Sequence, residues 1–149
     1  MSMKCPFCIE KSNEYYNLDL FIEEFEHSYL ILHRNQSFQG RCLLILKNHY
    51  NNFWEIPIDV SFGINEELKI VTKSIKDAFD AELINIASLG NQVRHLHYHI
   101  IPRYKNDSNK GTPPWPNKEL LISPKEYKTN IDKIRTEIHK YISNDLLHR

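Results

Sequence analysis

The chain has 149 residues, of which 41% are hydrophobic and 26% charged, the ordinary composition of a single globular domain. Lysine plus arginine and aspartate plus glutamate both number 19, so the formal net charge is zero. This balance argues against intrinsic disorder and against a domain that coats nucleic acid. No apolar run approaches the roughly 20 residues that span a bilayer, and residues 1–10 lack the apolar centre of a signal peptide. We therefore expect a cytoplasmic protein with no nucleic-acid or membrane partner.

The three cysteines occur in two different sequence contexts. Cys5 and Cys8 form a CxxC pair, and Cys42 stands alone in an apolar run. An odd number of cysteines without a signal peptide argues against a secreted, disulfide-rich fold. The simplest interpretation of Cys42 is a small buried hydrophobe.

Strand signals come first along the chain. Residues 15–25 alternate imperfectly between apolar and polar side chains, and residues 28–33 are a better strand candidate. The continuous apolar run at 41–47 predicts a central strand buried on both faces. Residues 48–52 then form a polar turn, and we expect Trp54 to lie in the core.

Two apolar stripes at helical spacing predict two helices. Residues 64–79 repeat apolar side chains every three or four positions, and acidic residues lie near the start of this helix, where the helix dipole favours them. A second helix is predicted over about 124–147, with Pro124 suited to its first turn. The two stripes consist of Ile64, Leu68, Val71, Ile75 and Phe79, and of Tyr127, Ile131, Ile134, Ile138 and Tyr141.

Further strands lie between the two helices. Residues 82–89 and 93–101 predict strands, and Pro102 is expected to end the second. Residues 106–116 are rich in Asn, Ser, Gly and Pro and predict a loop. Strands and helices do not alternate strictly, so the pattern favours an α+β domain of about five mainly antiparallel strands with two main helices. We expect residues 1–149 to form one domain, with a core over about 1–115.

Three histidines on the last predicted strand are the most informative feature. Alternate side chains of a strand share a face, so His95, His97 and His99 point the same way. Three interpretations are open: a solvent-facing strand that happens to use histidine, a metal site built on the HxH spacing, or a nucleophilic histidine oriented by its neighbours.

The segment His95-Leu96-His97-Tyr98-His99-Ile100-Ile101 resembles the His-φ-His-φ-His-φ-φ signature of the histidine triad superfamily of nucleotide hydrolases and transferases. The resemblance covers roughly the first two-thirds of the chain and implies a histidine-triad fold. It also implies that His97 attacks the α-phosphorus of a nucleoside phosphate derivative. Water would then hydrolyse the nucleotidyl-histidine. His99 would donate hydrogen bonds to phosphate oxygens, and His95 would orient the site or bind metal.

Other substrate contacts depart from the family pattern. Many members carry Gly-Gln-Ser/Thr-Val before the triad, whereas residues 90–93 here read Gly-Asn-Gln-Val. Asn91 and Gln92 can still donate amide hydrogen bonds to phosphate. Asn35 lies where relatives place an acidic residue on the ribose hydroxyls, and either that role or a simple polar turn is open. Trp115 closes over the site or packs on the surface.

The CxxC pair resembles the N-terminal cysteines of zinc-binding family members. That resemblance implies a zinc ion bound by Cys5, Cys8, His49 and His95, with a structural role because no coordination position is left for water. Two alternatives remain open: a redox pair, although the βαβ context of thioredoxin is missing, or free cysteines with His49 simply ending a turn.

The leading hypothesis is a hydrolase that cleaves a nucleoside phosphate derivative at its α-phosphate. Dinucleoside polyphosphates, nucleoside phosphoramidates and adenylylated compounds all fit as substrates, and a purine nucleotide is expected. The alternatives are a catalytically weak nucleotide sensor and a metal-dependent hydrolase that uses the HxH pair. The resemblance further implies a homodimer and no organic cofactor.

Overall fold

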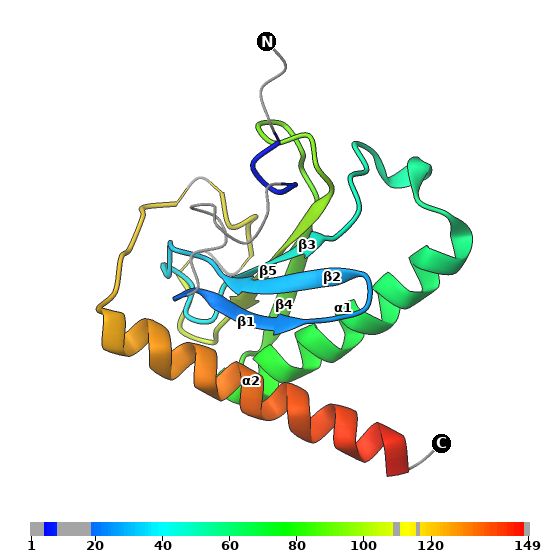
Figure 1. Ribbon diagram of the computed structural model, residues 1–149. Coiled ribbons are helices and arrows are strands. Elements are labelled where there is room, and N and C mark those ends of the chain that lie inside the picture. The colour runs from blue at the N-terminus through cyan, green and yellow to red at the C-terminus, as the bar shows by residue number, and fades with distance from the viewer. Residues whose placement is uncertain (1–4, 9–18, 109–110, 116, 148–149) are drawn as a thin grey trace.

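The computed structural model describes residues 5–8, 19–108, 111–115 and 117–147. Five antiparallel strands form one sheet in the order β1-β2-β3-β5-β4, and two long helices complete the fold (Figure 1). The predicted α+β class, with about five strands and two main helices, is confirmed. The elements are β1 Phe21–Glu24, β2 Ser28–Leu32, β3 Cys42–Leu46, the short 3-10 helix η2 Phe53–Glu55, α1 Ile58–Phe79, β4 Leu83–Ala87, β5 His97–Arg103 and α2 Pro124–Leu147.

Both helices cover the same face of the sheet. Strand β3 is buried throughout and pairs with β2 on one side and β5 on the other, as its continuous apolar run predicts. Its even-numbered residues share one core with the apolar stripes of α1 and α2, whereas Leu43 and Ile45 belong to a second, smaller cluster on the opposite face. That opposite face is free of α1 and α2, so side chains on it are available to form a site.

Helix α1 begins at Ile58, six residues before the predicted start at Ile64. Pro57 stands at the N-cap, and its fixed φ suits the chain entering a helix. Ile58 and Phe62 are 76% and 68% exposed, so the first turns carry no buried stripe from which the periodicity could be read. Trp54, which we expect in the core, is instead 81% exposed on η2.

Strand β5 runs through a proline that the sequence predicts to end it. Pairing with β3 stops at Ile100, while pairing with β4 continues to Arg103. The Arg103 carbonyl accepts the N–H of Glu82 on the β4 side, so the preceding Pro102 directs its nitrogen to the other side, where the β3 ladder has ended. The missing N–H therefore breaks no ladder hydrogen bond.

Strands β1 and β5 differ from their predicted bounds. Strand β1 covers only part of the predicted 15–25 segment, of which residues 15–18 lie outside the described residues. Strand β5 begins at His97 instead of Val93, because residues 91–93 and 95 lie in bends. Residues 5–8 lie beside this loop, at the end of the sheet away from α2 (Figure 1).

In the described chain, neither α1 nor α2 is apolar enough along its length to cross a membrane.

Candidate functional site

His97 and His99 lie on the sheet face that the helices leave open. In the antiparallel register, His97 is opposite Ile45 and His99 is opposite Leu43 of β3. The two imidazole ring centroids are 5.3 Å apart. Tyr98 and Ile100 face the helical core, as strand alternation predicts.

A backbone carbonyl fixes the tautomer of His97. The Nδ1 atom of His97 lies 2.7 Å from the carbonyl oxygen of His95. A carbonyl oxygen only accepts, so Nδ1 carries the proton and donates. The Nε2 atom of His97 is therefore left with a lone pair, as a nucleophile requires. The sequence shows that such an acceptor is needed but does not identify it.

His99 is neutral and incompletely paired. Burial, together with the neighbouring His97 and Arg41 side chains, lowers the pKa of His99 to about 4. The imidazole is thus uncharged near pH 7, able to donate one N–H. Its Nδ1 atom is buried and has no hydrogen-bond partner within the described part of the chain.

The N-terminal segment supplies an apolar wall beside His97. Phe7, the residue between Pro6 and Cys8, is 4% exposed and contacts His97 edge-on, with ring centroids 5.0 Å apart. It also contacts the His95 ring at 5.7 Å. Phe7 completes the smaller apolar cluster, whose other buried members are Ile31, Leu43 and Ile45. The CxxC segment is therefore part of the histidine site.

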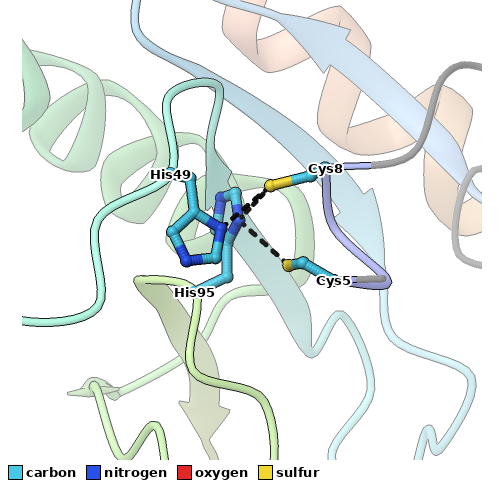
Figure 2. A group of neighbouring side chains, drawn as sticks. All are labelled: Cys5, Cys8, His49 and His95. Atoms are coloured by element: carbon cyan, nitrogen blue, oxygen red, sulfur yellow. Dashed lines mark hydrogen bonds between the residues drawn. The ribbon is translucent and has the colours of Figure 1, made fainter. Parts of the chain in front are cut away.

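Four side chains gather into a candidate metal centre at the end of the sheet (Figure 2). The Nδ1 atom of His95 lies 3.4 Å from Cys5 Sγ and 3.3 Å from Cys8 Sγ. The Nδ1 atom of His49 lies 2.9 Å from Cys8 Sγ, and the four ligand atoms all lie within 4.8 Å of one another. A tetrahedral ion with Zn–S and Zn–N bonds of about 2.3 and 2.0 Å separates sulfur and nitrogen ligands by roughly 3.6 Å. These four residues could hold a metal ion.

Hydrogen bonds aim both imidazoles at this centre. His95 Nε2 lies 2.7 Å from the carbonyl oxygen of Leu46, so Nε2 carries the proton and the Nδ1 lone pair faces the thiols. His49 Nε2 lies 3.1 Å from Asn51 Oδ1 and donates to it, so the Nδ1 atom of His49 likewise faces the Cys8 thiol. Without a cation, desolvation and the adjacent Cys5 thiol raise the pKa of Cys8 to about 11. Formation of thiolate at neutral pH therefore needs a positive ion.

The three predicted substrate-binding residues form no hydrogen bond with the triad histidines in the described part of the chain. Asn91 and Gln92 are exposed on the loop before β5, and among the described residues no hydrogen bond joins either to the triad. Asn35 is 8% exposed, and its Oδ1 atom accepts the N–H groups of Ser37 at 2.9 Å and Leu120 at 3.1 Å. That oxygen therefore holds a turn together, and a ribose contact by Asn35 stays a prediction.

Three further residues border the triad. Arg41 immediately precedes β3 and is backbone-bonded to His33, whose N–H donates to the Arg41 carbonyl at 2.9 Å. The His33 ring lies 6.1 Å from the His99 ring, and the Trp115 ring lies 5.3 Å from it. Trp115 thus lies on the site, one of the two possibilities left open by its sequence. Arg41 was not among the predicted site residues. The signal that could have indicated it is its position two residues before Leu43, because alternate residues of an extended segment share a face, here the open face of the sheet.

A cavity of about 630 Å³ lies elsewhere, between the segment around β1 and the first half of α2. Leu20, Phe21, Tyr127 and Ile131 line it, together with Arg34 and Arg135. None of the triad histidines contributes to its wall. Hydrogen-bonding groups suited to phosphate chemistry gather instead on the open sheet face.

Comparison with known proteins identifies this arrangement. Residues 17–106 match the family model of the HIT domain. The chain belongs to the histidine triad (HIT) family. It is 33% identical over 90 residues to an uncharacterized HIT-like protein of Methanocaldococcus jannaschii, covering 58% of this chain and 70% of that protein. It is 32% identical over 101 residues to an adenosine 5′-monophosphoramidase of Schizosaccharomyces pombe, covering 67% of this chain and 74% of that enzyme.

A third relative and two solved structures extend the HIT comparison. An adenylylsulfatase of Arabidopsis thaliana is 31% identical over 108 residues, covering 69% of this chain and 54% of that protein. A hypothetical histidine triad nucleotide-binding protein of Sulfolobus tokodaii superposes with a TM-score of 0.70 at 27% identity, covering 91% and 93% of the two chains. A zinc-bound histidine triad protein of Mycobacterium smegmatis superposes with a TM-score of 0.71 at 22% identity, covering 97% and 99%. The HIT fold is therefore shown along most of the chain.

Proposed function

We propose that this HIT protein is a hydrolase that cleaves nucleoside phosphate derivatives at the α-phosphate through a covalent intermediate on His97. The observation that carries the proposal is the hydrogen bond from His97 Nδ1 to the His95 carbonyl, which leaves the Nε2 lone pair on the open face. Two relatives named as nucleotide-cleaving enzymes, the adenylylsulfatase and the monophosphoramidase, support this class of reaction.

The residues divide the chemistry between them. His97 Nε2 forms a bond to the α-phosphorus as the bond to the leaving group breaks, and the leaving group keeps the electron pair. Neutral His99, next along the same face, donates an N–H to the phosphoryl oxygens, whose charge grows in the transition state. Water then attacks the phosphorus, and the P–N bond breaks to regenerate the imidazole. Phe7 restricts the approach of solvent to His97 from the side where residues 5–8 lie.

Trapping the covalent intermediate tests this function. The protein is mixed briefly with diadenosine tetraphosphate or adenosine 5′-phosphoramidate, quenched in neutral denaturant and weighed by mass spectrometry. We expect an added adenylyl group on the wild type and none on His97→Ala. His139→Ala is the matched control, since His139 lies exposed on α2 and pairs with Glu23. A nucleotide sensor would bind these compounds without adduct or turnover, and that outcome would overturn the proposal.

We propose in addition that the metal centre binds one zinc ion in a structural role. Two thiols and two imidazoles suit zinc, and four protein ligands leave no open position for water. The zinc-bound relative of M. smegmatis supports this choice of metal. When bound, zinc would connect residues 5–8 through His49 to the segment after β3 and through His95 to the loop before β5. His95 directs Nδ1 to the cysteines and Nε2 to the Leu46 carbonyl, which leaves neither nitrogen free to share an ion with His97 as a catalytic HxH pair would.

The remaining parts of the proposal are a purine nucleotide as substrate, a homodimer and a cytoplasmic location; of these, the family resemblance implies the homodimer. Strand β4 lies at an edge of the sheet, and its Leu83 and Ile86 are 46% and 49% exposed. Apolar side chains at an unpaired strand edge favour association. Light scattering during gel filtration measures the oligomeric state directly.

A further inference from the structure

A buried guanidinium group without a counter-ion lies beside the triad. Arg41 is 4% exposed, and its Nε atom has no hydrogen-bond partner within the described residues. No carboxylate of the described chain forms an ion pair with it. Burial lowers the pKa of the Arg41 guanidinium, which reflects the free energy needed to keep the charged form out of water. An uncompensated buried cation of this kind is suited to an anionic ligand.

Other unpaired donors gather at the same place. Of the described chain, three buried side-chain nitrogen or oxygen atoms lack a partner, and two of them are Arg41 Nε and His99 Nδ1. The Trp115 ring lies 5.7 Å from the Arg41 guanidinium carbon and 5.3 Å from the His99 ring, so it covers both. His33 accepts the Asn35 N–H at its Nδ1 atom, which leaves Nε2 as a further donor nearby.

The strand register places this group beyond His99 as seen from His97. His97 pairs with Ile45 and His99 with Leu43. Arg41 immediately precedes β3, two residues before Leu43, and so continues the same face. Each such step advances about 6.6–6.8 Å along a strand. Two such steps separate the Arg41 backbone from the level of His97, and the guanidinium lies beside Trp115, which contacts His99. An anion bound to Arg41 and joined to the α-phosphate at His97 therefore extends past His99.

We propose that Arg41 binds the anionic leaving group, so that the preferred substrates are nucleoside polyphosphates, whose leaving group is a phosphate or phosphate chain. This rests on the proposed function of the triad. When His97 Nε2 bonds to the α-phosphorus, the bridging P–O bond breaks and its electron pair stays on the departing phosphate as one additional negative charge. Arg41 stabilises that charge. The leaving group of adenosine 5′-phosphoramidate is its amino group, whose nitrogen takes a proton from solvent and departs as neutral ammonia, so its departure gains little from Arg41.

Paired substrates test the assignment. Initial rates are measured on diadenosine tetraphosphate and on adenosine 5′-phosphoramidate for the wild type, Arg41→Met and Arg41→Lys. Removing one donor to transition-state charge lowers kcat by about 10²- to 10³-fold, so Arg41→Met should lose about this much on the tetraphosphate and much less on the phosphoramidate. Arg41→Lys should recover part of the loss. Equal losses on both substrates, or a wild type that cleaves only the phosphoramidate, would overturn the proposal and leave the hydrolase function standing.

A binding measurement separates this proposal from the hydrolase function. Inorganic pyrophosphate, titrated calorimetrically, should bind the wild type and bind Arg41→Met at least tenfold more weakly, even if no substrate is cleaved (tenfold corresponds to about 1.4 kcal/mol). Equal binding by both proteins would overturn the anion site. Cleavage of neither nucleotide together with Arg41-dependent pyrophosphate binding would overturn only the hydrolase function.

Thermal unfolding separates a ligand-binding arginine from a structural one. Arg41→Met removes an uncompensated buried charge, so the melting temperature should stay constant or rise. Arg135→Met is the matched control, because Arg135 Nε and Nη2 donate to the carbonyls of Ile22 and Phe21 at 3.0 and 3.2 Å. It should lower the melting temperature and leave the ratio of the two substrate rates unchanged. A lower melting temperature for Arg41→Met would indicate a structural role and contradict the proposal.

Discussion

Phe7 lies between the candidate metal centre and His97, the proposed nucleophile, and replacing it with alanine tests this connection. Its ring contacts both His95 and His97 and belongs to the apolar cluster on the open face of the sheet. A buried phenylalanine removes about 150–250 Å² from water, which at about 25 cal/mol per Å² is worth about 4–6 kcal/mol. Observed Phe→Ala losses in protein cores are similar, about 3–5 kcal/mol.

This loss falls mainly on the attachment of residues 5–8 to the sheet. In the described part of the chain, these residues form no strand or helix and reach the sheet through Phe7 and the two thiols. We therefore expect Phe7→Ala to release zinc to a chelator faster than the wild type, to lower the melting temperature and to raise KM. Phe7→Leu should restore most of each property, since it refills much of the same volume.

The assay combines three measurements on the same preparations: zinc release monitored with a colorimetric chelator, thermal unfolding and steady-state kinetics. Phe53→Ala is the matched control, because Phe53 is 61% exposed on η2 and contributes little buried surface. Phe7→Ala with wild-type zinc release and melting temperature would refute the connection between the CxxC segment and the triad. A change of KM alone would show that Phe7 lines the substrate site without anchoring the segment.

Three further predictions follow from the same contacts. Cys8→Ser should lower the zinc content, measured by elemental analysis, from one ion per chain toward zero and lower the melting temperature, whereas Cys42→Ser, which alters no metal ligand, should leave the zinc content unchanged. In metal-free protein, the free energy of unfolding should fall as the pH decreases from about 6.5 toward 4. The folded-state pKa of His99 is lowered to about 4, so the unfolded chain binds the proton first. Replacing His99 with Asn should reduce this pH dependence in urea titrations, and an unchanged dependence would contradict the assignment. Arg103→Met should cost about 3–5 kcal/mol in denaturant unfolding, because the Arg103 side chain is 1% exposed and its Nε donates to Asp107 Oδ2 at 2.6 Å; a loss under 1 kcal/mol would show that this pair contributes little.

The sequence alone determined the elements whose signal is local. The apolar run at 41–47 specifies a buried central strand, and the stripes at 64–79 and 124–147 specify the packed faces of both helices. Alternation along β5 likewise places His97 and His99 on one face and Tyr98 in the core. These features depend on residues within a few positions of one another, so the repeat of a strand or helix reveals them.

Only the tertiary structure decided which atoms meet. The carbonyl that fixes the tautomer of His95 belongs to Leu46, 49 positions away, and the N–H that occupies Asn35 comes from Leu120, 85 positions away. Strand pairing brings Arg41 next to the triad, and the loop after β5 returns Trp115 to the same place. The local pattern around Asn35, Trp115 and Leu120 is that of a turn or loop. Leu46 and Arg41 belong to a run that predicts a strand, and a strand pattern does not indicate which distant side chain its residues meet. Their roles depend on strand order and register, which are set by packing across the whole sheet and not by periodicity within one segment.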